Sequence, residues 1–85
     1  MKVNNVIEDR VLDARGLMCP MPVVKASREL MLMQPGQVLK VIASDRAART
    51  DFPAWVEDVG HQLLRSGQES DGTLVFYVRK REESE

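Results

Sequence analysis

The spacing of apolar residues in this sequence alternates between the two-residue period of a β-strand and the roughly 3.6-residue period of an α-helix. The pattern predicts strands over residues 10–14, 38–43 and 74–78, with a short strand near 68–70. Two helical stripes lie between them. The first consists of Val23, Ala26, Leu30 and Met33. The second consists of Phe52, Val56, Val59 and Leu63, with Trp55 beside it.

Glycine and proline mark the ends of these segments. Gly16 ends the first strand, and we expect it to adopt backbone angles that other residues avoid. Pro20 opens the first helix, where a missing N–H costs nothing, and Pro22 is tolerated in the same turn. Further breaks are expected after the first helix, after the second helix and within the last hairpin, at Gln34-Pro35-Gly36, Ser66-Gly67 and Asp71-Gly72.

The resulting order of elements is strand, helix, strand, helix, strand, strand. It predicts an α/β two-layer sandwich, βαβαββ, with a four-stranded mixed sheet and two helices on one face. We expect residues 1–85 to form a single domain, with a loose arm over about 1–8 and a charged tail over about 81–85. A chain of this size buries only about 60–65% of its unfolded surface. It therefore has little room for an enclosed substrate pocket, and chemistry is expected at the surface.

Composition argues against several classes of protein. Twelve Lys and Arg against thirteen Asp and Glu leave a net charge of -1, which disfavours direct binding of nucleic acid. No apolar run is long enough to span a membrane, and residues 1–10 lack the apolar core of a signal peptide. The single cysteine precludes an internal disulfide and favours a reducing, cytoplasmic location. Cys19 and His61 are too few for a Cys/His zinc site, so no metal is expected.

Cys19 stands directly before the predicted start of the first helix and is the strongest candidate for chemistry. Unpaired N–H groups and the macrodipole at a helix start favour a thiolate, so we expect a lowered pKa, with Arg15 adding positive charge. Gly16, Pro20 and Pro22 are the supporting residues of this loop, and the prolines should make it stiff. A free cysteine is also often a buried and inert residue, and this alternative stays open.

The groups that an enzyme would need beside a reactive cysteine are missing from the sequence. His61, the only histidine, is expected on the solvated side of the second helix and too far from Cys19 to act as its base. Pro22 stands where a Cys-x-x-Cys motif would place a second cysteine. A thiol with neither partner suits a relay whose other proteins supply the remaining machinery, so a stand-alone enzyme is not expected.

Apolar residues near Cys19 are candidate partner contacts. Met18 and Met21 flank the sulfur and would form an adaptable apolar rim. Val24 and Met31 either extend this rim or lie at the edge of the core.

Charged residues near the same loop are candidates as well. Lys25 and Arg28 on the first helix would meet an acidic partner or form a solvated face. Asp45, Arg49 and Asp51 are expected in the loop before the second helix, where they either cap that helix or contact a partner.

The cysteine segment resembles the signature of a known family of sulfur carriers, the TusA (SirA-like) family. The matching residues are Leu12-Asp13-Ala14-Arg15-Gly16-Leu17-Met18-Cys19-Pro20-Met21-Pro22. The resemblance continues over most of residues 11–80 and includes Met33-Gln34-Pro35-Gly36, Asp45 and Arg49-Thr50-Asp51-Phe52-Pro53. It implies a βαβαββ sandwich.

The resemblance also implies a function. Cys19 would receive sulfane sulfur as a persulfide from a cysteine desulfurase or a rhodanese-like sulfurtransferase and pass it to an acceptor protein. In related proteins this relay leads to 2-thiouridine in tRNA, to cytoplasmic sulfur oxidation or to molybdenum cofactor synthesis. No cofactor beyond the persulfide sulfur is implied. A monomer that forms transient complexes is expected, and any link to tRNA would be indirect.

Two departures from the family pattern bear on partner choice. Met18 replaces an arginine that often precedes the cysteine, and Ser44-Asp45-Arg46 replaces a frequent Asp-Asp-Pro. Both departures bear more on the identity of the partner than on the sulfur chemistry. The alternative function is a non-catalytic interaction or regulatory module in which Cys19 is incidental.

Overall fold

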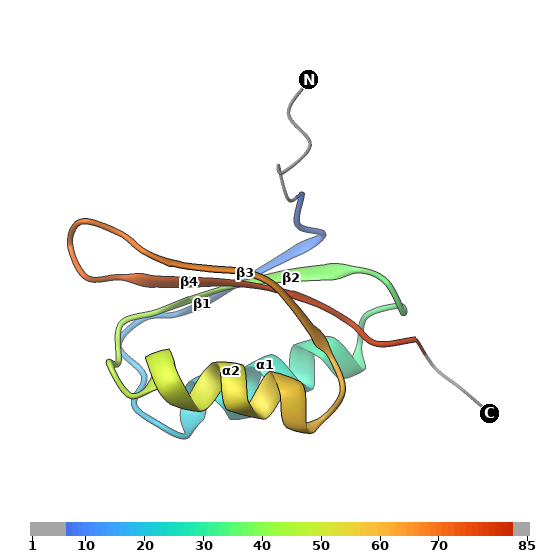
Figure 1. Cartoon of the computed structure of the whole chain (residues 1–85), viewed down its shortest axis with the longest axis horizontal. Helices are drawn as coiled ribbons and strands as arrows, with labels where there is room; N and C mark the ends of the chain where they lie inside the picture. Colours follow the sequence, from blue (N-terminus) through green and yellow to red (C-terminus); the bar gives the residue numbers. More distant parts are fainter. Residues whose placement is uncertain (1–6, 83–85) are drawn as a thin grey trace.

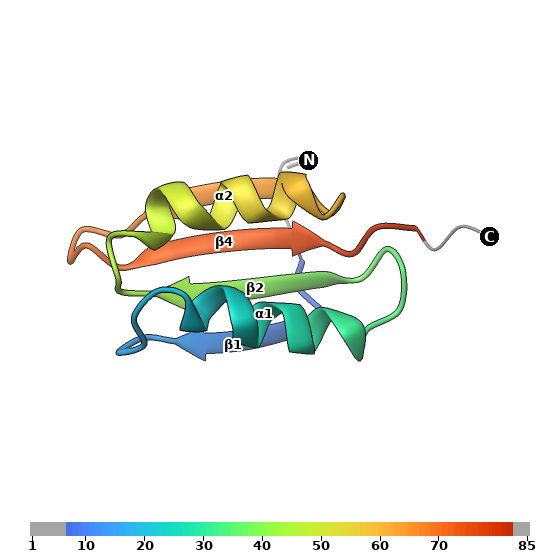
Figure 2. The same cartoon turned by 90° about the horizontal axis from the view of Figure 1, so that it is seen from below.

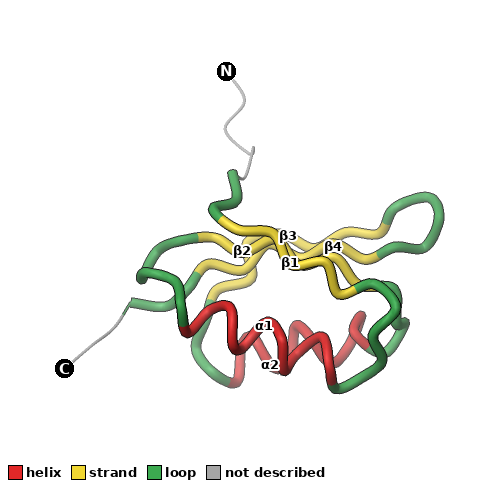
Figure 3. Tube along the Cα trace, turned by 180° about the vertical axis from the view of Figure 1, so that it is seen from behind, coloured by secondary structure: helices red, strands yellow, loops and turns green. Residues whose placement is uncertain are grey.

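The computed structural model describes residues 7–82, and these form a sheet with both helices packed against one of its faces (Figure 1). Seen from behind, strands and helices separate into two layers (Figure 3). The predicted two-layer sandwich is confirmed. Its elements are β1 (Arg10–Ala14), α1 (Met21–Met31), β2 (Val38–Ala43), α2 (Ala48–Asp58), β3 (Gln62–Gln68) and β4 (Leu74–Arg79). Most of the predicted arm and tail, residues 1–6 and 83–85, lies outside the described residues.

The sheet is mixed, with the strand order β1-β2-β4-β3. β1 and β2 pair in parallel, whereas β4 pairs antiparallel with both β2 and β3. The carboxyl ends of β1 and β2 therefore reach the same edge of the sheet, and both helices begin there (Figure 2). This arrangement brings the β1–α1 loop, which carries Cys19, next to the β2–α2 loop. In α/β sheets this edge is where ligands and reactive groups are commonly placed.

The core fills the space between the sheet and the helices. The predicted helical stripes supply much of it, and the ring of Phe52 stacks on Phe76 of β4 with 4.6 Å between centroids. Val23 is only partly buried, whereas Pro22, expected to matter for its backbone alone, is fully buried. The buried core from the helices and the segment after α1 comprises Ala26, Leu30, Met33, Ala48, Phe52 and Val56.

The prediction for the second helix was wrong at both of its ends. α2 begins at Ala48 and ends at Asp58, and Gly60 follows with a positive φ of 88°. The N–H of Gly60 donates to the Glu57 carbonyl and the N–H of His61 to the Val56 carbonyl, which is the Schellman pattern that stops a helix. The chain then enters β3, which shares only Gln68 with the strand predicted near 68–70, so that prediction was placed too late. Ser66-Gly67, predicted to end the second helix, lies within β3.

Leu63 consequently belongs to β3 and not to the stripe of α2, although it still packs against the core. Its spacing of four residues from Val59 imitates a helical period. Val59 is the partly buried residue that directly follows α2, whereas Leu63 reaches the core from β3, which is why apolar periodicity alone placed the helix end too late.

Candidate functional site

The candidate site is built from two loops that meet at the carboxyl edge of β1 and β2. The N–H of Gly16 donates to Ser44 Oγ at 2.8 Å, and the N–H of Cys19 donates to Asp45 Oδ2 at 2.6 Å. Gly16 adopts a φ of 83°, as the sequence predicted. The β2–α2 loop thus fixes the backbone of the cysteine loop at two points. Asp45 is a positioning residue in this arrangement.

Cys19 is exposed, and its sulfur is held by the second helix. The thiol donates a hydrogen bond to Asp51 Oδ2 at 3.0 Å. The sequence suggested that Asp51 lies in the loop before the second helix, but Asp51 lies in the first turn of α2. The sequence interpretation did not assign Asp51 to the sulfur because 32 residues separate the two positions. Its only signal was its place in the Arg49-Thr50-Asp51-Phe52-Pro53 segment.

The surroundings of Cys19 raise its pKa above the ordinary value. The hydrogen bond to Asp51 has the largest effect, followed by partial desolvation and by the negative charges of Asp51 and Asp45. The prediction of a lowered pKa was therefore wrong. It relied on the start of α1, but Pro20 and Pro22 lack an N–H and the N–H of Met21 donates to the Met18 carbonyl at 2.8 Å.

Arg15 does not supply the positive charge that was expected at the sulfur. Its Nε and Nη2 both donate to the carboxylate of Asp13, each at 2.8 Å. The pair is exposed. It raises the pKa of Arg15, and the side-chain hydrogen bond from Arg15 lowers the pKa of Asp13 to about 2. Among the described residues, the charges that act on Cys19 are carboxylates.

Asp45 and Arg49 occupy roles that differ from the predicted helix cap. Asp45 Oδ1 accepts from the N–H of Ala47 at 3.2 Å, while Oδ2 accepts from Cys19. These two hydrogen bonds, that of Cys19 first, lower the pKa of Asp45. The capping residue of α2 is Ala47, whose side chain forms no cap. Arg49 lies inside the helix and is exposed.

Apolar side chains are exposed beside Cys19 and along α1. Met18 is 74% exposed and Met21 is 39% exposed, as expected for an apolar rim. Val24 and Met31 are also exposed, so they do not belong to the core edge. Lys25 and Arg28 are exposed on the same helix. The sequence interpretation did not single out Leu32, which is exposed as well.

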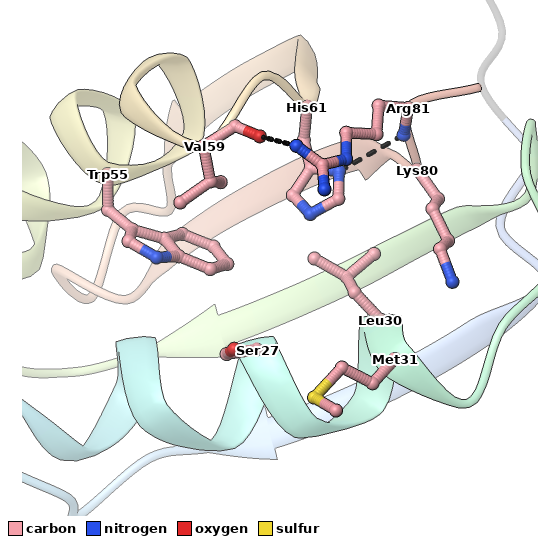
Figure 4. A pocket seen from close by; sticks show the side chains of 8 residues that line it. All are labelled: Ser27, Leu30, Met31, Trp55, Val59, His61, Lys80 and Arg81. Atoms are coloured by element: carbon pink, nitrogen blue, oxygen red, sulfur yellow. Dashed lines mark hydrogen bonds between the residues drawn. The ribbon is translucent and has the colours of Figure 1, made fainter. Parts of the chain in front are cut away.

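A second feature lies at the opposite end of the helices, where a cavity of about 350 Å³ opens between α1, α2 and the end of β4 (Figure 4). Its lining includes Trp55, His61, Lys80 and Arg81. Arg81 donates to the Val59 carbonyl at 2.8 Å, and Lys80 donates to the carbonyl of Met33, just beyond α1, at 2.7 Å. Cationic groups here meet carbonyl groups at helix ends.

His61 is half-buried in the turn after α2, so its prediction as a solvated helical residue was wrong. Its Nδ1 accepts from the N–H of Arg81 at 3.0 Å, and its ring lies 6.0 Å from that of Trp55. His61 follows the C-terminal end of α2, whereas Cys19 contacts the first turn of that helix. This separation agrees with the expectation that His61 does not act on the sulfur.

Within residues 7–82, no group of three or more His, Cys, Asp and Glu residues is arranged to hold a metal ion. Neither helix of this region is long and apolar enough to cross a membrane.

Comparison with known proteins identifies relatives over nearly the whole chain. The family described as Sulfurtransferase TusA matches residues 10–80. A Bacillus subtilis protein is 43% identical over 72 residues, which are 85% of this chain and 95% of its own length. The protein named Sulfur carrier protein TusA in Pseudomonas entomophila is 40% identical over 79 residues, covering 93% of this chain and 98% of that protein.

A solved structure supports the fold independently. The SirA-like protein from Desulfitobacterium hafniense superposes with a TM-score of 0.75 and covers 86% of this chain and 99% of its own, at 24% identity. Together with the sequence matches, the fold and the Cys-Pro-x-Pro loop lead to one assignment. The chain belongs to the TusA family.

Proposed function

We propose that this protein is a sulfur carrier that holds sulfane sulfur as a persulfide on Cys19. The observation that carries the proposal is the exposed thiol of Cys19 in a loop whose backbone is fixed by Ser44 and Asp45. A fixed and accessible sulfur can meet the reactive cysteine of another protein at low entropic cost. The name of the Pseudomonas entomophila relative, a sulfur carrier, supports the same role.

The transfer follows from thiol chemistry. The Cys19 thiolate attacks the outer sulfur of a persulfide on the donor's cysteine. A bond forms between Cys19 Sγ and that sulfur while the sulfur–sulfur bond of the donor breaks, and the donor keeps the electron pair as a thiolate. The proton that the Cys19 thiol released on ionising is taken up by the donor's thiolate. One sulfur atom moves with no net oxidation or reduction, and the reverse step on an acceptor unloads the carrier.

The surroundings of Cys19 favour a carrier over a stand-alone enzyme. The chain has one cysteine, and His61 lies at the other end of α2, so neither a resolving thiol nor an imidazole base is at the sulfur. The donor we propose is a cysteine desulfurase or a rhodanese-like sulfurtransferase, and the acceptor is another sulfur-accepting protein. The relay would serve tRNA thiolation or cytoplasmic sulfur oxidation.

The proposed contact surface extends from the sulfur along α1 to its last turn. Met18 and Met21 offer exposed apolar side chains, and Lys25 and Arg28 add positive charge on α1. Such a surface fits a partner with an apolar patch bordered by acidic residues, bound transiently by a monomeric carrier.

Intact-mass spectrometry tests the proposal directly. Wild type and Cys19→Ser are incubated with a cysteine desulfurase and cysteine, or with a rhodanese and thiosulfate. We expect wild type alone to gain one sulfur atom, which reductant removes, and the donor that loads it indicates the pathway. Absence of the gain in folded wild type with either donor would reject the proposed carrier.

The second candidate is an interaction module in which Cys19 is incidental. The raised pKa of Cys19 favours it, because a protonated thiol is a poor nucleophile. It predicts that Cys19→Ser retains full activity in a cell that depends on this protein, whereas the carrier predicts complete loss.

A further inference from the structure

Asp51 is the one side chain that hydrogen-bonds the Cys19 sulfur within the described part of the chain. It belongs to α2, whereas Cys19 lies in the loop before α1. We propose that Asp51 sets the affinity of Cys19 for transferable sulfur by favouring the unloaded thiol over the persulfide. This inference deepens the proposed function and rests on it. The carrier would then be poised to give its sulfur away.

The charges that act on Cys19 come from two elements. Asp51 projects from α2 and accepts the thiol hydrogen bond at 3.0 Å. Asp45 comes from the β2–α2 loop and accepts the backbone N–H of Cys19. Arg15, in the same loop as Cys19, is engaged by Asp13. The electrostatic environment of the sulfur is therefore dominated by two carboxylates.

Loading changes what the sulfur presents to these carboxylates. The thiol donates a hydrogen bond to Asp51, but the same sulfur in a persulfide carries no proton and cannot donate one. The outer sulfur of a persulfide is a stronger acid than a thiol and is an anion at neutral pH. Loading therefore breaks one hydrogen bond and adds a negative charge near Asp51 and Asp45, and both effects disfavour the loaded state. The raised pKa of Cys19 has the same origin.

The test is a sulfur-exchange equilibrium with glutathione and glutathione persulfide. The Cys19 thiol and glutathione persulfide exchange to give the Cys19 persulfide and glutathione, and intact mass gives the ratio of loaded to unloaded protein. We expect Asp51→Asn to raise this ratio about three- to tenfold, which corresponds to about half to one pKa unit. Asp58→Asn removes the same charge from an exposed position at the other end of α2 and should leave the ratio unchanged.

A second measurement needs no sulfur donor. The rate of alkylation of unloaded Cys19 by iodoacetamide is followed against pH, and we expect the profile of Asp51→Asn to move to lower pH. Asp51→Glu keeps the charge and should restore most of the wild-type profile. An Asp51→Asn profile that coincides with wild type would overturn the inference, and so would an unchanged exchange ratio.

The two measurements separate this inference from the proposed function. If the alkylation profile shifts but wild type takes up no sulfur from any donor, the carrier function fails and the sulfur-affinity role of Asp51 fails with it. If wild type is loaded and Asp51→Asn behaves identically, the carrier function stands and only the role of Asp51 is rejected. Circular dichroism of each variant confirms that it is folded.

Discussion

The two ends of the helix layer obey the same electrostatic rule, but only one of them leaves a reactive group exposed. At the N-terminal end, Asp45 and Asp51 accept hydrogen bonds from the backbone and the thiol of Cys19. At the C-terminal end, Lys80 and Arg81 donate to carbonyls at the ends of the helices. Lys80 is only 8% exposed, whereas Cys19 is exposed. Acids at helix starts and bases at helix ends both complement the macrodipole.

The difference between the ends lies in what each group satisfies. Lys80 donates to a backbone carbonyl beside the end of α1, so we expect its contribution to be to the free energy of unfolding. Asp51 accepts a hydrogen bond from the thiol that we propose takes up sulfur, so we expect its contribution to be to reactivity. We therefore expect substitutions at the C-terminal end to change stability and those at the N-terminal end to change the behaviour of Cys19.

The largest expected effect on stability is at Lys80. Lys80→Met keeps the apolar stem but removes the donor to the Met33 carbonyl, and an unsatisfied buried acceptor costs about 1–3 kcal/mol. Urea unfolding followed by tryptophan fluorescence should show a lower midpoint, while the alkylation rate of Cys19 stays at the wild-type value. A change in alkylation rate without a change in midpoint would contradict the division between the two ends.

A matched pair of glycines sharpens the comparison. Gly16 and Gly60 both adopt positive φ, at 83° and 88°, one at each end of the layer. Alanine at either position costs about 1–2 kcal/mol because an L side chain is strained in this conformation. A Cβ added at Gly16 would have no neighbouring atom within 4 Å. A Cβ added at Gly60 would contact only the Arg81 side chain, at 3.6 Å.

The two glycine variants should therefore lose similar stability but differ in reactivity. Gly16→Ala shifts the loop that carries Cys19 and should change its alkylation rate, whereas Gly60→Ala should not. Thermal unfolding and iodoacetamide alkylation of both variants measure this. Equal alkylation rates in the two variants would show that the loop conformation does not control the thiol.

The smallest expected effect on stability is at Asp45, and its sign depends on pH. Its pKa is lowered in the folded protein, so its contribution is present above the ordinary Asp pKa of about 3.9 and is lost as the pH falls through the lower folded value. Asp45→Asn should therefore reduce stability slightly at neutral pH and make no difference in strong acid. Urea midpoints of wild type and Asp45→Asn are measured across this pH range. A difference between the two midpoints that does not change with pH would contradict the link between the ionisation of Asp45 and stability.

The sequence predicted the fold because each element has its own local signal. The alternating apolar residues of β2 and β4, the glycine at the end of β1 and the prolines at the start of α1 all act within a few residues. The end of α2 was missed, although Gly60 is the glycine expected at that position of a helix terminus. The apolar spacing from Val59 to Leu63 was given more weight than that glycine.

The candidate site was predicted only in part for a different reason. Cys19 and its loop were found from local chemistry, but the direction of the Cys19 pKa was wrong because it depends on Asp45 and Asp51. These residues reach the sulfur through the pairing of β1 with β2 and the packing of α2. Neither contact has a local sequence signal. Arg15 was misjudged for a different reason: its partner Asp13 lies only two residues away, at the end of β1, and the prediction of charge at the sulfur did not include this pair.

The contact between Asp51 and Cys19 also divides the site between two separate stretches of sequence. The Cys-Pro-x-Pro loop provides the nucleophile, whereas the charge that tunes it is encoded 32 residues later. If Asp51 sets the affinity for sulfur as we propose, substitutions in α2 would adjust how firmly Cys19 holds sulfur while the loop stays unchanged. A peptide that contains only the loop would carry the recognisable motif without the Asp51 hydrogen bond to its sulfur.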